Sequence, residues 1–386
     1  MVQIIGTGVT HFAKRPQTSL RELVAEAVTE ALADAGVTAG QIQAAYHANA
    51  IAGLMTGQEM VRGQVHLRPV GVYGVPVVNV ENACASGSTA VHLARTSLMA
   101  EQHDLVLVVG AEKMTSDDPR RAPLAVATAL DVELGFDVLS RSPFMDVYAE
   151  KVRQYLAETD ATTHDLARVT VKAHHNGALN PKAQYGGSRT REEVLADVMI
   201  SAPLTRMMCS PIGDGAAALV LASDRRAQSL GANAPVRIRT SVLQSGFSPD
   251  SRVPAAMRSA RLAYEEAGIG PGELDVVELH DAAASSELMR YESLMLCQPG
   301  EGAGMIRTGA TALGGTIPVN PGGGLLARGH PIGATGCAQL VELCDQLRGR
   351  AGRRQVAGAR VGLADNGGGW VDGDSAAECV HILTAD

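Results

Sequence analysis

The sequence has few aromatic residues and no excess of positive charge. Phenylalanine, tryptophan and tyrosine make up 3% of the 386 residues, and the formal net charge at pH 7 is −8. Proteins that bind single-stranded nucleic acid combine aromatic stacking platforms with a positively charged groove. Because both are scarce here, we expect no nucleic-acid partner.

Long apolar runs are also absent. No stretch approaches the roughly 18–20 apolar residues that a membrane-spanning helix needs. The first residues, MVQIIGTGVTHF, show no basic region followed by a long apolar stretch and a cleavage site. We therefore expect a protein that does not bind a membrane and that works in the cytoplasm.

The cysteines lack the spacing of a disulfide framework or a zinc ribbon. The chain has six, and no two form a Cys-x-x-Cys pair. The segment GTGVTH at 6–11 lacks the third glycine of a dinucleotide-binding fingerprint. The sequence thus predicts free thiols, no metal site and no permanently bound cofactor.

What the sequence does contain is an alternation of strand-like and helical segments. Apolar runs rich in valine and leucine stand at 104–110, 217–223 and 274–280, and an amphipathic helical pattern covers 20–36. Such alternation predicts an α/β fold with helices packed on sheets.

The chain also repeats itself weakly. Residues 35–49 resemble residues 267–281, each reading as a glycine turn, a short linker and a strand. The segment CASGSTA at 84–90 likewise corresponds to GATGCAQ at 333–339, each opening an amphipathic helix. These correspondences predict two related halves.

The repeat suggests domain boundaries. We expect an N-terminal half made of 1–112 and 207–235, and a C-terminal half at 236–386. The intervening residues 113–206 are richer in charge and poorer in strand signals, which indicates an insertion lying over the first half. Its basic side chains either form ordinary solvated surface or receive an anionic ligand.

Cys84 lies where a valine-rich strand gives way to a helix, within VENACASGSTA. A lone cysteine is often a small buried apolar residue. At a helix N-terminus, however, the backbone N–H groups favour the thiolate, which is the nucleophilic form. The small neighbours of Cys84 would let a substrate approach its sulfur, and both interpretations stay open at this point.

Histidines and glycines in the C-terminal half favour the second interpretation. His330 precedes a proline and two glycines, so it lies in a turn and can reach a nucleophile elsewhere in the sequence. His280 ends a predicted buried strand, and ADNGGGW at 364–370 offers backbone N–H groups for an oxyanion hole.

At this point the sequence resembles the thiolase superfamily. The segment 84–115 is similar to the nucleophile segment of thiolases, and NPGGGLLARGHPIGATG at 320–336 resembles their glycine-rich histidine block. The resemblance spans essentially the whole chain and includes the acetyl-CoA acetyltransferases. It implies two duplicated βαβαβαββ-type halves in five α/β layers, with a helical loop insertion over the active site.

The resemblance also implies roles for individual residues. Cys84 would take the acyl group as a thioester, and His330 would activate it. The backbone N–H groups of Cys84 and Gly367 would form the oxyanion hole. His280 matches the sterol-carrier and archaeal branch of the family, where a His-Asp pair replaces an asparagine motif. Contacts to coenzyme A are expected from Gly323, Gly324, Arg141 and Arg206.

The sequence departs from the family at the second catalytic cysteine. Asp365 stands where many thiolases have the cysteine of a C-x-G-G-G motif, and Ala282 stands where the sterol-carrier type has its own. The group that moves the proton is then His280, which we favour, Asp365 with a pKa raised by burial, or His330 acting twice.

These residues predict an acyltransferase that cleaves a β-ketoacyl-CoA with coenzyme A as co-substrate, or runs the reverse Claisen condensation. The small Ala282, Ala283 and Ala284 suggest room for a bulky or aromatic acyl group. The alternatives are a thiolase-like retro-aldolase acting on a β-hydroxyacyl-CoA and a non-catalytic acyl-CoA-binding subunit. The resemblance further implies a homodimer or a dimer of dimers, and in some members a small accessory subunit with a zinc ribbon and an OB fold.

Overall fold

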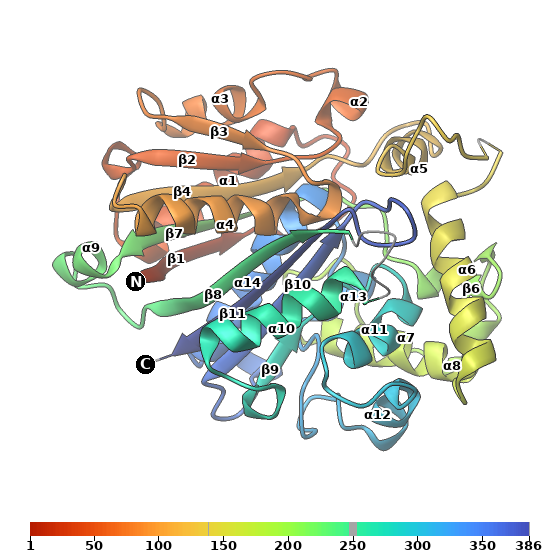
Figure 1. Cartoon of the computed structure of the whole chain (residues 1–386). Helices are drawn as coiled ribbons and strands as arrows, with labels where there is room; N and C mark the ends of the chain where they lie inside the picture. Colours follow the sequence, from red (N-terminus) through yellow and green to blue (C-terminus); the bar gives the residue numbers. More distant parts are fainter. Residues whose placement is uncertain (138, 247–252, 386) are drawn as a thin grey trace.

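The computed structural model describes residues 1–137, 139–246 and 253–385. Its main feature is a nine-stranded sheet with the order β3-β2-β4-β7-β1-β8-β11-β10-β9. Figure 1 shows this sheet passing from the red and orange strands to the blue ones. Its strands are β1 (Val2–Val9), β2 (Ala44–Ala48), β3 (Val77–Val80), β4 (Leu105–Glu112), β7 (Gly215–Ser223), β8 (Val236–Ser245), β9 (Val276–Glu278), β10 (Val361–Gly368) and β11 (Ala377–Ala385).

The sheet consists of two halves with the same topology. In the first half β3, β2 and β4 are parallel to one another. Strand β7 is antiparallel to β4, and β1 is antiparallel to β7. In the second half β9 and β10 are parallel, β11 and β8 continue antiparallel, and a parallel bridge from Val277 to Val319 takes the place of the outermost strand. The halves join where β1 pairs with β8. The predicted duplication in an α/β fold is confirmed.

Helices divide the molecule into layers. Helices α4 (Ser86–Met99) and α14 (Thr335–Leu347) lie together in the middle and contact strands of both halves, whereas α1 (Leu20–Ala35) and α10 (Ala255–Ala267) cover the outer faces. A Cβ atom added to Gly87 would lie 2.9 Å from the backbone nitrogen of Cys337, so the two central helices approach very closely. The resulting α-β-α-β-α order is the predicted five-layered arrangement.

Local sequence fixes the limits of α1. Ser19 and Glu22 form a reciprocal capping box at its start, and Gly36 closes it with a left-handed φ of 64°. Its leucine, valine and alanine side chains face the first half of the sheet and are buried. The remaining helices are α2 (Ala52–Thr56), α3 (Arg62–Leu67), α9 (Asp224–Ser229), α11 (Ala284–Ser293), α12 (Gly302–Thr308) and α13 (Gly324–Ala327).

The expected insertion contains α5 (Arg121–Ala127), α6 (Pro143–Glu158), α7 (Thr163–Gly177) and α8 (Arg191–Leu195), with the short strands β5 (Met199–Ser201) and β6 (Leu204–Thr205). Figure 1 shows α5, α6 and α8 on the side of the molecule away from both termini. Helix α6 contacts α11 of the second half. The boundaries at 112, 206 and 235 stay predictions.

The described residues include no helix with the length and apolarity that crossing a lipid bilayer requires.

Candidate active site

Cys84 lies in a strained turn between β3 and α4. A short 3-10 turn over Ala83–Ala85 precedes the helix, and Ala83 has a φ of 48°, in the region that favours glycine. The Ser86 hydroxyl accepts a hydrogen bond from the backbone N–H of Asn82 and donates one to the carbonyl of Ala83. The turn is thus held by its own side chains, and Cys84 is only 4% exposed.

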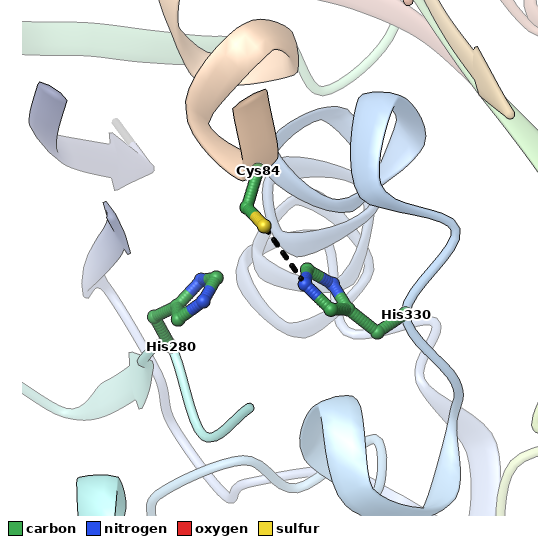
Figure 2. Close-up of side chains that lie close together, drawn as sticks. All are labelled: Cys84, His280 and His330. Carbon is green, nitrogen blue, oxygen red and sulfur yellow. Dashed lines mark hydrogen bonds between the residues drawn. The ribbon is translucent and has the colours of Figure 1, made fainter. Parts of the chain in front are cut away.

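His330 faces the sulfur of Cys84. Its Nε2 atom lies 3.3 Å from Sγ (Figure 2), and its Nδ1 atom lies 2.7 Å from the hydroxyl of Thr335. That hydroxyl donates its single proton to the carbonyl of Pro331, so it accepts the hydrogen bond from Nδ1–H. The Nε2 atom of the neutral ring is therefore unprotonated and able to accept the thiol proton.

His280 lies beside this pair with the opposite tautomer. Its ring centroid is 5.1 Å from that of His330, with the planes at 84°. The side-chain amide of Asn366 donates to Nδ1 of His280 over 3.0 Å, so the proton of the neutral ring is on Nε2. Figure 2 shows both rings close to Cys84. The site combines one imidazole that accepts with one that donates.

All three groups are neutral at rest. Burial, with a smaller contribution from the nearby Glu112, raises the pKa of the Cys84 thiol to about 12. Burial also lowers the pKa of His330 to about 3, with Arg328 adding to the effect, and lowers the pKa of His280 well below its ordinary value. The thiolate expected from the helix N-terminus is not the resting form, because desolvation outweighs the helix dipole.

Glu112 joins the segments that surround the site. At the end of β4, its carboxylate accepts hydrogen bonds from the backbone N–H groups of Ala50 and Gly333 over 2.9 and 3.1 Å and from the Asn49 amide over 2.7 Å. It therefore ties the loop that follows His330 to the first half of the sheet. Burial raises its pKa to about 7.

The carboxylate of Asp365 lies in a buried ion pair. Burial raises its pKa, as an acid/base role would need, but its carboxylate forms an ion pair with Arg290, which also pairs with Glu378 over 2.9 Å. Neighbouring residues in a strand point to opposite faces, so Asn366 is the residue that reaches His280. Asp365 is thus a buried ion-pair partner in this structure, and an acid/base role for it stays a prediction.

The glycine run that follows packs directly on the turn that contains Cys84. Gly367, Gly368 and Cys84 line the same cavity. A Cβ atom at Gly368 would lie 2.2 Å from the carbonyl oxygen of Asn82 and 2.5 Å from the backbone nitrogen of Ala85. Only a residue without a side chain permits this approach. The oxyanion-hole role of Gly367 stays a prediction.

Gly323 and Gly324 belong to a turn and not to a ligand pocket. Their φ values are 101° and 57°, and a Cβ atom at Gly324 would lie 2.2 Å from the carboxylate of Asp281. That carboxylate accepts from the backbone N–H of Leu325 over 2.7 Å and holds the start of α13. Neither glycine lines a cavity at Cys84, so the coenzyme A contact expected from them is not supported.

Two cavities meet at Cys84. The first, of about 570 Å³, is the basic pocket; it is lined by Lys14, Arg141, Arg189 and Arg206. The second, of about 310 Å³, is the Trp370 pocket; it is lined by Phe144, Tyr148, Lys151, Met257, Met289 and Trp370.

Both cavities include Cys84, Phe144 and Tyr148 in their walls. The predicted ligand residues Arg141 and Arg206 do line one of them. Of the three alanines expected to make room for an acyl group, Ala282 lines the basic pocket, and Ala283 and Ala284 line neither of these two cavities. Ala283 and Ala284 are fully buried in the apolar core.

Cys84, His280 and His330 are also the one group of possible metal ligands found among the described residues. The ligand atoms of Cys84, His280 and His330 all lie within 4.8 Å of one another. A sulfur and two imidazole nitrogens suit zinc. Because these are also the atoms of the candidate nucleophile and base, a metal bound here would compete with acyl transfer.

The sequence interpretation missed three groups at the site. Thr335 lies inside the recognised histidine block, so its spacing from His330 was a usable signal. Asn366 stands next to the residue that was chosen, and Lys14 lies outside the insertion where the basic ligands were expected.

Comparison with known proteins places the chain in a family. Residues 2–188 match the family described as "Thiolase, N-terminal domain", and residues 241–384 match "Thiolase C-terminal domain-like". The chain is 38% identical over 390 residues to an acetyl-CoA acetyltransferase of Methanothermobacter thermautotrophicus, with 99% of each chain covered. It is 35% identical to the benzoylsuccinyl-CoA thiolase subunit BbsB of Thauera aromatica, covering 92% of this chain and 91% of that one. Human sterol carrier protein 2 is 34% identical, covering 95% of this chain and 69% of that one.

Two solved structures share the fold. The Ltp2-ChsH2(DUF35) aldolase superposes with a TM-score of 0.82 at 24% identity, covering 100% of this chain and 98% of that one. An acetyl-CoA acetyltransferase from Syntrophomonas wolfei gives 0.75 at 18% identity, covering 100% and 99%. With both halves matched by family descriptions and relatives aligned over nearly its full length, the chain belongs to the thiolase superfamily and is a thiolase-type acyltransferase.

Proposed function

We propose that the protein cleaves a β-ketoacyl-CoA with coenzyme A through an acyl thioester on Cys84, or runs the reverse Claisen condensation. The observation that carries the proposal is that two cavities meet at Cys84, whose thiol faces an unprotonated nitrogen of His330. The basic pocket suits the phosphates of coenzyme A, because guanidinium groups bind phosphate well.

In the first half-reaction the Cys84 thiol passes its proton to Nε2 of His330 while the sulfur attacks the ketone carbon. The oxygen that becomes negative accepts hydrogen bonds from the backbone N–H groups of Cys84 and Gly367. The bond to the α carbon then breaks, which leaves the acyl group on the sulfur and an enolate of the shorter CoA thioester.

The enolate has to receive a proton at its α carbon. We assign this step to His330, which then acts twice, and not to His280, which the sequence favoured. After the first transfer the His330 ring carries an extra proton, which it can deliver to the α carbon of the enolate. The neutral His280 ring has only its Nε2 proton, whose complete removal would leave an imidazolate. We therefore assign His280 a hydrogen bond to the enolate oxygen.

In the second half-reaction the thiol of free coenzyme A gives its proton to His330 and attacks the acyl thioester. Collapse of the tetrahedral intermediate releases the new acyl-CoA, and His330 returns the proton to the Cys84 sulfur. Both steps use the same histidine, in keeping with the absence of a second cysteine.

The test is the intact mass of the protein after brief exposure to β-ketoacyl-CoAs, with and without free coenzyme A. We expect a mass gain equal to the acyl group, removed by coenzyme A and absent in Cys84→Ala. The Cys337→Ala variant is the matched control, because Cys337 is an equally buried thiol that lines neither cavity. Turnover without an adduct would favour retro-aldol cleavage, and binding without either would favour a non-catalytic subunit.

A bulky or aromatic acyl group is supported by the lining of the Trp370 pocket and by the name of the benzoylsuccinyl-CoA thiolase relative. We expect a higher kcat/KM for an aromatic β-ketoacyl-CoA than for acetoacetyl-CoA. Equal or better turnover of the small substrate would contradict this expectation.

We also propose a homodimer or dimer of dimers and an accessory subunit with a zinc ribbon and an OB fold. Support for the accessory subunit comes from two names: BbsB is called a subunit, and the solved aldolase contains a DUF35 component. Light scattering after gel filtration, alone and after co-expression with such a subunit, tests both. A fully active monomer would refute them.

A further inference from the structure

The Trp370 pocket contains a lysine whose ammonium group lies over an aromatic ring. Lys151 of α6 places its ammonium nitrogen 4.0 Å from the centre of the Trp370 ring, a cation–π contact. Among the described residues it forms neither an ion pair nor a hydrogen bond. It nevertheless lines a cavity whose wall includes the nucleophile Cys84.

The other charged groups in this cavity already have partners. Arg290 pairs with two buried carboxylates. Glu292 accepts a hydrogen bond from the Tyr155 hydroxyl over 2.6 Å, and Asp374 accepts one from the first backbone N–H of α10 over 2.8 Å. Among the described charged side chains that line this cavity, Lys151 is thus the one without a hydrogen bond or an ion pair, and its charge is available to an anionic ligand.

The surroundings make this unpaired charge unfavourable. Burial, reinforced by the neighbouring Arg290, lowers the pKa of Lys151 to about 8, although Asp374 and Glu378 partly oppose the change. At neutral pH the ammonium form still dominates. An anion that enters the cavity would pair with a partly desolvated cation, where charge-assisted hydrogen bonds are strongest.

The phosphates of coenzyme A are not this anion. The arginines that suit those phosphates line the basic pocket, which is the other cavity that reaches Cys84. A CoA thioester that enters through the basic pocket reaches the sulfur with its acyl end leading. Only the acyl group then extends into the Trp370 pocket, where Phe144, Met257 and Met289 offer apolar contacts to a hydrocarbon chain.

Resting on the proposed function, we infer that the acyl group ends in a carboxylate and that Lys151 is the residue that selects it. The hydrocarbon part packs against the apolar wall, and the carboxylate binds the ammonium group above Trp370. Lys151 contacts the substrate far from the reacting carbon, so it determines specificity and does not take part in bond making.

The experiment compares two β-ketoacyl-CoAs of the same chain length, one ending in a carboxylate and the other in its methyl ester. We expect the wild-type protein to prefer the carboxylate in kcat/KM. Lys151→Met should reduce that preference by about tenfold to hundredfold, the range for a hydrogen bond to a charged group. Lys151→Arg should retain most of it. Arg153→Met is the matched control on the same helix, since Arg153 lines neither cavity.

Binding separates failure of this inference from failure of the proposed function. Calorimetry measures the affinity for each thioester in Cys84→Ala, which forms no adduct, and in the double variant that adds Lys151→Met. A carboxylate preference that depends on Lys151 supports the inference even if no thiolysis occurs. Equal loss for both thioesters, or no wild-type preference in turnover and in binding, overturns it while leaving the Cys84 thioester test unaffected.

Discussion

Replacing Thr335 by valine would test whether its hydroxyl fixes the tautomer of His330. The substitution keeps the shape of the side chain but removes the oxygen that accepts the hydrogen bond from Nδ1–H of His330. The ring loses the contact that fixes its tautomer, and a ring with its proton on Nε2 would point a donor at Cys84. We therefore expect slower acylation of the sulfur.

The size of the effect follows from when His330 becomes charged. At rest the ring is neutral, so the lost hydrogen bond contributes about 1 kcal/mol, whereas a bond to a charged group contributes about 1.5–3 kcal/mol. The positive charge appears only as the thiol proton moves. The larger loss therefore falls on the transition state, and the barrier rises by the difference of about 0.5–2 kcal/mol, which slows acylation by about twofold to thirtyfold.

The assay is the single-turnover rate of acyl-adduct formation, followed by rapid quenching and intact mass. Thr335→Ser should restore the rate, because it restores the hydroxyl. Thr96→Val makes the same substitution in α4, where the hydroxyl only contacts the carbonyl of His92, and should have no effect. An acylation rate within twofold of wild type in Thr335→Val would refute the assignment of the tautomer.

Three further predictions concern charge and metal. Arg290→Met should lower the free energy of unfolding by about 3–5 kcal/mol, because two carboxylates stay buried without their cation; an unchanged urea midpoint would contradict this. His47 and His66 share a hydrogen bond, and burial lowers their pKa values to about 3 and about 4. Below pH 6.5 the unfolded chain therefore binds more protons than the folded one, and the free energy of unfolding falls as the pH drops toward 4. His66→Gln should weaken that pH dependence, measured by urea titrations at several pH values. Zn²⁺ should inhibit thiolysis reversibly by binding Cys84 and His280, and prior acylation of the sulfur should protect; inhibition that EDTA cannot reverse would argue against this site.

The fold and the centre of the site could be predicted because their signals are local. Alternating strands and helices and the repeated glycine turns define two related halves. The fold places the matching turns at the starts of α4 and α14, which lie side by side. Cys84 precedes one of these helices and His330 the other, so the repeat itself brings these two side chains together.

The face of the sheet on which Asp365 lies could not be predicted from the sequence, because a glycine run follows it. Residues in a strand alternate between two faces, and a shift of one residue exchanges them. Glycines carry no side chain that marks the face, so the sequence left the register of 365 and 366 undetermined. The structure settles it through two contacts, Asp365 with Arg290 and Asn366 with His280.

The Trp370 pocket could not be predicted from the sequence, because its lining residues come from segments far apart in the chain. Lys151 lies on a helix of the expected insertion, and Trp370 follows β10 near the end of the chain. Each residue alone is ordinary: a lysine on a helix is usually solvated, and a lone tryptophan usually packs in a core. Their contact depends on how α6 packs against the second half, which no local pattern encodes.

The neutral resting state has a consequence for the proposed mechanism. With the pKa of Cys84 raised to about 12 and that of His330 lowered to about 3, an ion pair between them is strongly disfavoured before substrate arrives. The thiol therefore becomes a nucleophile only when a carbonyl carbon accepts its electrons and the developing oxyanion offsets the new positive charge on the ring. Because the same neutral histidine is restored after each half-reaction, it can receive the proton of Cys84 and later that of coenzyme A. A site built this way has no chemical need for the second cysteine that the sequence lacks.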